Sequence, residues 1–285
     1  MQQHFGVGRV FNGSRTDQEN ELRQTPGNSS LAFNPPDWQD WNPGSDSTLY
    51  AQIANAFRQY AETFGGIPPV QEIGFFNVRY AYDHTSARVV TERNVPAVFG
   101  GGTLLIYRYI TTSAKALPTG RSTSGKAPLP LPLREDTVSR IITHELAHGL
   151  VEVALTPAST GGAAGQAPDP QLLTDYKTAV GWTAGAAPRL FDIGAPAVQQ
   201  AIAAGTVPDS TYEITQANWN EPRWIEQPIS SYMTTHPAED FPEAVMAYVV
   251  QPDLLRTRSP RRFQFIATRA NRLGPLLRQI GPASR

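Results

Sequence analysis

The feature that most constrains this chain is residues 143–149, which place two histidines four positions apart inside an apolar helical pattern. Such positions lie one above the other on the same face of an α-helix, so the imidazoles of His144 and His148 can reach one metal ion. Glu145 would then stand beside that ion in the position of a general base. Apolar residues recur around the motif at helical spacing: Val138, Ile141, Ile142, Leu146, Leu150 and Val153. We therefore expect a helix over about 138–155.

The alternative interpretation treats His144 and His148 as core residues and Glu145 as incidental. It would place three polar groups on or near an apolar helix without naming any partner for them. The chain also has no cysteine, which excludes thiolate ligands, a cysteine nucleophile and disulfide bonds. Histidine and carboxylate side chains are the zinc ligands that remain.

Composition limits the partners. A formal net charge of −1 gives no general electrostatic reason to bind nucleic acid or a membrane surface. No apolar run approaches the roughly 18 residues that a spanning helix needs, and the first residues lack the pattern of a Sec signal. We expect no nucleic-acid or membrane partner, synthesis in the cytoplasm and, for an exported protein, a dedicated secretion machine as a partner.

The expected fold class is α+β, with a small twisted mixed sheet, an active-site helix and a mainly helical C-terminal half. Residues 1–47 are polar and rich in breakers and read as an N-terminal arm, and 48–285 read as the catalytic domain. Within that domain we expect a sheet-containing part over 48–156 and a helical part over 157–285. Residues 103–110 form a clear strand pattern just before the motif helix. If this strand is an edge strand, an extended peptide could pair with it; an interior strand is the alternative.

Two histidines leave a catalytic zinc ion one protein ligand short, because such sites usually have three and keep one position open. A third histidine in an extended motif is absent, since Val151 and Ala154 occupy the required glycine and histidine positions. Glu239 and Glu243 are four apart, so one can bind the metal while the other accepts a hydrogen bond from a ligand histidine. His236 is a further candidate, and the residues alone do not decide between these assignments.

A resemblance decides the assignment. Ser231 and Tyr232, six intervening residues and the Glu-x-Phe-x-Glu-Ala pattern of 239–244 are followed by Arg-Phe-Gln-Phe-Ile at 262–266. This arrangement resembles the catalytic domain of anthrax lethal factor and the related Pro-Pro endopeptidases, over about 138–155 and 230–266. The resemblance implies a zincin-like fold with one zinc ion.

In the terms of that resemblance, Glu239 is the third zinc ligand and Glu243 a carboxylate that supports the ligands. Tyr232 donates its hydroxyl to the oxyanion. One departure is Pro242, where these relatives usually have alanine. A proline inside a helix removes the hydrogen bond to the carbonyl four residues earlier, that of Ala238. The cost is small if the helix begins at about Pro237 or Ala238; a helix that begins earlier would place Glu239 on a kinked segment.

The resulting hypothesis is a zinc-dependent endopeptidase that acts on a protein or peptide substrate and uses Glu145 as the general base. Residues 180–182 and 224–228 are also similar to zinc peptidases assigned as bacterial toxin effectors, which implies an effector role. Two alternatives stay open: a zinc peptidase that acts on cell-wall peptides, and a zincin-fold binding module without turnover.

Overall fold

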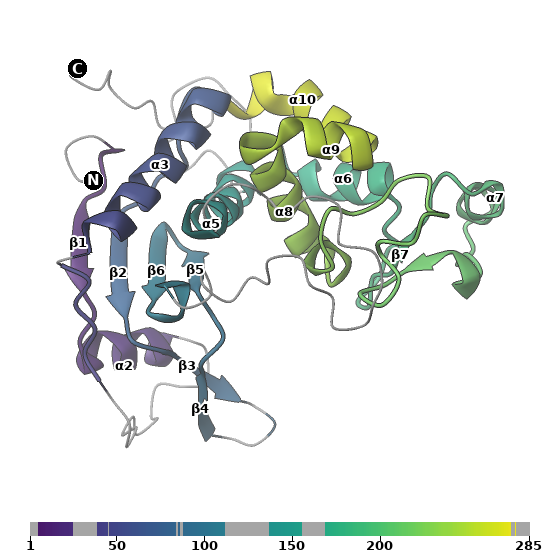
Figure 1. The fold of residues 1–285 in the computed structure, drawn as a ribbon. Coiled ribbons are helices and arrows are strands. Elements are labelled where there is room, and N and C mark those ends of the chain that lie inside the picture. Colours follow the sequence, from purple (N-terminus) through teal and green to yellow (C-terminus); the bar gives the residue numbers. More distant parts are fainter. Residues whose placement is uncertain are drawn as a thin grey trace. The chain divides into compact units, whose positions relative to one another are not determined.

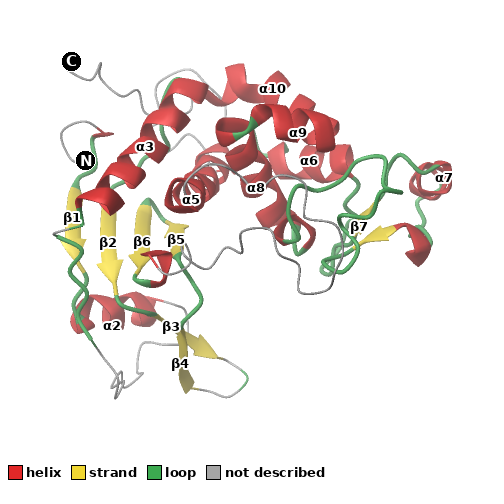
Figure 2. Cartoon of the chain, viewed as in Figure 1, coloured by secondary structure: helices red, strands yellow, loops and turns green. Residues whose placement is uncertain are grey.

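The computed structural model describes residues 5–24, 39–44, 46–83, 85, 88–111, 137–155, 169–274 and 277. Its described part combines helices with a small mixed sheet, as the α+β expectation requires (Figures 1 and 2). The first compact unit comprises the described residues up to Arg58 and those of 69–145. The second comprises 59–68 and the described residues of 146–279.

The elements of the first unit, with the two helices that continue into the second, are β1 (Arg9–Asn12), α2 (Arg15–Gln24), α3 (Ser47–Phe64), β2 (Glu72–Phe76), β3 (Arg79–Asp83), β4 (Arg88–Glu92), β5 (Ala97–Gly100), β6 (Thr103–Tyr107) and α5 (Thr137–Leu155). Those of the second unit are α6 (Leu172–Val180), β7 (Leu190–Phe191), α7 (Pro196–Ala203), η2 (Ser210–Tyr212), β8 (Glu213–Ile214), η3 (Tyr232–Thr234), α8 (Pro237–Val250), α9 (Pro252–Arg258) and α10 (Pro260–Leu273).

The main sheet has the strand order β1-β2-β6-β5 (Figure 1). Strands β1, β2 and β6 run parallel, and β5 pairs antiparallel with β6. The strand expected over 103–110 is therefore β6, which ends at Tyr107 and lies in the interior of the sheet. The antiparallel edge is β5 instead, and β3 and β4 form a separate hairpin.

The two central strands of the sheet, β2 and β6, are buried on both faces. Side chains alternate between the faces of a strand, so Ile73 and Phe75 of β2 share one face. There, the Phe75 ring makes edge contacts with Tyr50 of α3 and with Trp41, at centroid distances of 5.5 and 5.9 Å. On the other face Phe76, Leu105 and Tyr107 form a cluster with Phe11, Val95 and Val98. Burial on both faces explains the continuous apolar run of β6.

The second unit is built around helices α6, α8 and α10. Tyr176, Phe241 and Phe265 come from these helices in that order, and their rings meet edge to face at centroid distances of 5.0 to 6.5 Å. Such edge-to-face packing adds specific geometry to the burial of large apolar area. The mainly helical character expected after residue 157 is seen in the described residues of this region, with only the short β7–β8 pair added.

The described part of the N-terminal region contains a strand that the sequence pattern did not predict. Residues 9–12 form β1, which pairs in register with β2 as an edge strand of the sheet. Trp41 contacts Phe75, so this region is tied to the sheet at two points. Among the described residues, no helix combines the length and the apolar character needed to cross a bilayer.

Candidate metal centre

Helix α5 carries both motif histidines. It spans Thr137–Leu155, which confirms the helix expected from the apolar spacing. Ile142, Leu146 and Leu150 are fully buried along its inner face. Within the first unit, Ser139 Oγ donates to the carbonyl of Gln52 in α3 at 2.9 Å, which ties the first turn of α5 to α3.

Helix α8 carries Glu239 in its first turn. His236 is the N-cap, and its Nδ1 accepts a hydrogen bond from the Ala238 backbone N–H at 3.1 Å. Pro237 occupies the first helical position, where a proline costs nothing because that N–H has no partner inside the helix. Of the two possibilities left open by the sequence, the structure shows the helix that begins at Pro237, and it continues without a break through Pro242.

His144, His148 and Glu239 come together. Each offers one ligand atom, and these atoms lie within 4.8 Å of one another, so the group could hold a metal ion. The Nε2 atom of His148 is 3.4 Å from Oε2 of Glu239. Two ligands of a tetrahedral zinc ion, each bound at about 2.0–2.1 Å, lie roughly 3.3 Å apart. The donor chemistry of the three residues and the distance between His148 and Glu239 are compatible with a metal ion such as zinc, and His144 and His148 lie on one continuous helix.

The same pair could be an ordinary ion pair, because a protonated histidine attracts a carboxylate at this distance. Two features favour the metal interpretation. A second imidazole converges on the same point, which an ion pair does not need. The side chains of His148 and Glu239 are 25% and 28% exposed, so a water molecule and a substrate can reach them.

Glu145 follows His144 directly on α5 and is nearly buried. Tyr232 opens the short helix η3 and is 48% exposed, which is unusual here because most large aromatic side chains among the described residues are buried. Glu243 is also buried, and one of its carboxylate oxygens accepts a hydrogen bond from Ser230 Oγ at 2.6 Å. The sequence did not identify Ser230 as a donor to Glu243.

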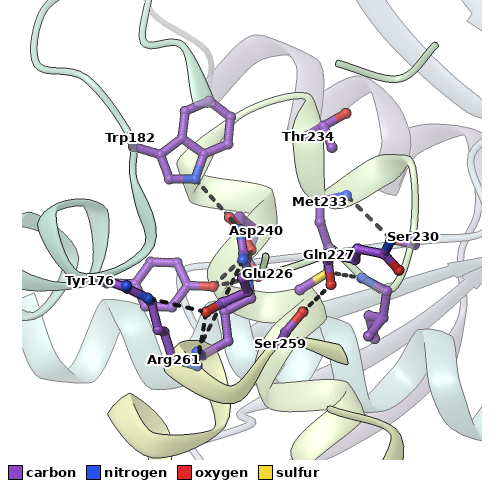
Figure 3. Close-up of polar contacts among 12 residues, drawn as sticks. Tyr176, Trp182, Glu226, Gln227, Ser230, Met233, Thr234, Asp240, Ser259 and Arg261 are labelled. Carbon is purple, nitrogen blue, oxygen red and sulfur yellow. Dashed lines mark hydrogen bonds and ion pairs between the residues drawn. The ribbon is translucent and has the colours of Figure 1, made fainter. Parts of the chain in front are cut away.

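Sequence reasoning also missed a buried polar cluster centred on Asp240, the residue that follows Glu239 (Figure 3). Its members have no regular spacing in the sequence, so a search for helical or strand periodicity could not find it. No family model, no curated protein and no solved structure matches this chain. The chemistry of the site is therefore argued from its own residues.

Proposed function

We propose that this protein is a zinc-dependent endopeptidase with a zincin-like fold. His144, His148 and Glu239 would bind one zinc ion. The convergence of their ligand atoms within 4.8 Å is the observation that carries the proposal. When bound, zinc supplies a Lewis acid that polarises a carbonyl and lowers the pKa of a coordinated water molecule.

Glu145 is the proposed general base. Its carboxylate would accept a proton from the attacking water molecule and return it to the leaving amine. The position supports this role, because Glu145 adjoins the ligand His144 on α5. Its low exposure limits competition from bulk solvent for the proton.

Tyr232 is the proposed oxyanion donor. The residue is exposed at the surface, and its backbone is held in η3, where the Thr235 N–H donates to the Tyr232 carbonyl at 3.1 Å. A donor that acts only on the developing charge stabilises the transition state selectively. Loss of such a donor typically lowers kcat by about 10²- to 10³-fold.

The edge strand β5 supports a polypeptide as substrate. It lies at one end of the strand order, so an extended peptide could pair with its outer side and be held by main-chain hydrogen bonds. The resemblance to lethal factor and the Pro-Pro endopeptidases points the same way. The weaker resemblance of residues 180–182 and 224–228 to toxin peptidases favours a bacterial effector.

The test is a comparison of the zinc-loaded protein with its Glu145→Gln variant. Each is incubated with a proteome, and new N-terminal peptides are sequenced. We expect new termini only with the wild type, because the glutamine of the variant cannot accept the proton. The variant should bind zinc as well as the wild type does. Equal cleavage by both proteins would remove Glu145 from the mechanism. Cleavage of purified peptidoglycan but of no protein would support the cell-wall alternative, and zinc binding without any cleavage would support a binding module.

A further inference from the structure

Asp240, the residue after Glu239, is a fully buried carboxylate with four donors (Figure 3). The Tyr176 hydroxyl and the Trp182 indole N–H donate to its two oxygens at 2.8 and 2.7 Å. The Arg262 guanidinium adds a two-pronged contact, from Nε at 2.8 Å and from Nη2 at 2.6 Å. These donors come from α6, from the residue pair that follows it, and from α10, so Asp240 is held from several directions at once.

Arg262 is itself fixed by a second carboxylate. It is 1% exposed, and its Nη1 donates to Oε1 of Glu226 at 3.0 Å. Glu226 also accepts backbone N–H groups from Arg261 and Arg262, at 3.0 and 3.4 Å, in the first turn of α10. A carboxylate in that position satisfies N–H groups that have no partner within the helix. The guanidinium therefore cannot rotate away from Asp240 without losing Glu226.

The cluster is more than a source of stability. Replacing a buried ion pair by packed apolar residues is often neutral or stabilising, so pairing alone does not explain the burial of these charges. The two-pronged contact between Arg262 and Asp240 fixes the orientation of the Asp240 carboxylate, because a planar guanidinium binds a carboxylate in one orientation. Asp240 sits in the first turn of α8, so fixing its orientation fixes the rotation of that turn.

Successive residues on a helix point about 100° apart. With Asp240 turned into the buried cluster, Glu239 is held on the more exposed side of the helix, where its Oε2 lies 3.4 Å from His148 Nε2. We infer that Asp240 and Arg262 are positioning residues, which set the rotation of the first turn of α8 and thereby place Glu239 for metal binding. This inference rests on the proposed function, because it needs Glu239 to be a metal ligand.

The test compares two neutral replacements inside the same cluster. Asp240→Asn removes the charge that orients the first turn of α8. Glu226→Gln removes a buried charge on the opposite side of Arg262 and leaves the contacts between Arg262 and Asp240 in place. Zinc affinity is measured by competition with a chelating dye. The visible spectrum of the cobalt-loaded protein reports the ligand geometry, and neither measurement requires a substrate.

We expect Asp240→Asn to weaken zinc binding by about tenfold, the lower end of the cost of losing the groups that orient metal ligands. Its cobalt spectrum should change, whereas Glu226→Gln should lose thermal stability and retain the wild-type affinity and spectrum. Wild-type affinity and spectrum in Asp240→Asn would overturn the inference. Equal losses of affinity in both variants would overturn it as well, because they would indicate general destabilisation.

If Asp240→Asn does not fold, a milder variant serves the same purpose. Arg262→Lys keeps the positive charge but loses the planar two-pronged contact that orients Asp240, and it leaves the Tyr176 and Trp182 donors in place. We expect an altered cobalt spectrum, and an unchanged one would overturn the inference. A wild-type protein that binds neither zinc nor cobalt would refute the proposed function itself, an outcome distinct from the others because it appears before any variant is made.

Discussion

The hydroxyl of Tyr176 makes the second unit sensitive to alkaline pH. Burial raises the pKa of this hydroxyl well above 10.0, the neighbouring Asp240 raises it further, and Arg262 opposes these effects. A raised pKa in the folded state means that the stability linked to Tyr176 is fully present below the unfolded value of about 10. That stability is lost as the pH rises through the folded pKa.

We expect the free energy of unfolding of the wild type to fall more steeply than that of Tyr176→Phe between about pH 9 and pH 11. One group contributes at most about 1.4 kcal/mol per pH unit. Urea denaturation at both pH values measures the two slopes. Tyr60 has a raised pKa from burial as well, but it is present in both proteins and cancels. Identical slopes would show that Tyr176 ionises as readily in the folded chain as in the unfolded one.

The residues of the site differ in how far the sequence alone could predict them. His144 and His148 could be found because helical geometry converts a spacing of four into a shared face. Choosing Glu239 as a ligand needed a resemblance, since the residues alone allowed Glu243 equally. Asp240 could not be found at all. Its partners Tyr176, Trp182 and Arg262 lie 64, 58 and 22 positions away, and tertiary contacts at such separations leave no period to detect.

At the scale of elements, prediction succeeded where apolar periodicity is long. Helix α5 extends over 19 residues and agrees with the helix expected from the sequence pattern. Strand β1 was missed because its four residues, Arg9–Asn12, stand in a polar region, and only their pairing with β2 makes them a strand. The two-residue strands β7 and β8 are likewise defined by pairing with each other. The strand order, which makes β5 an edge strand opposite β1, could not be predicted, because no short stretch of the sequence indicates which strands pair.

The C-terminus of α6 depends on Gly181. This residue has a φ of 101°, and its backbone N–H and that of Trp182 both donate to the Lys177 carbonyl, at 3.0 and 2.9 Å. A Cβ atom at this position would lie 2.3 Å from the Phe191 carbonyl oxygen. The tight end of the helix is what delivers the Trp182 indole to Asp240.

We expect Gly181→Ala to destabilise the protein by more than about 1 kcal/mol, because it combines a strained φ with a backbone clash. Gly185→Ala is the matched control. Its φ is 108°, but a Cβ there meets nothing within 4 Å, so only the conformational cost applies. Chemical denaturation of the two variants measures the difference. A smaller loss for Gly181→Ala than for Gly185→Ala would contradict the close approach to Phe191.

At the scale of the whole molecule, a metal ion would act as a cross-link between helices α5 and α8. If zinc binds the folded chain but not the unfolded one, the free energy of unfolding rises with the logarithm of the ratio of zinc concentration to Kd. The gain reaches about 4 kcal/mol at a thousandfold excess over Kd. We therefore expect the Tm to rise with added zinc and to fall when a chelator is added.

Two variants connect that shift to the proposed ligands. Glu239→Ala should abolish the rise in Tm with zinc, since two imidazoles alone hold the ion weakly and leave one helix out of the link. Glu221→Ala should retain it, because this carboxylate pairs with Arg223 on the surface. Differential scanning calorimetry with zinc and with chelator measures all three proteins. If Glu239→Ala kept the full rise in Tm with zinc, the third ligand would be another residue, and the ion would join α5 to a different element.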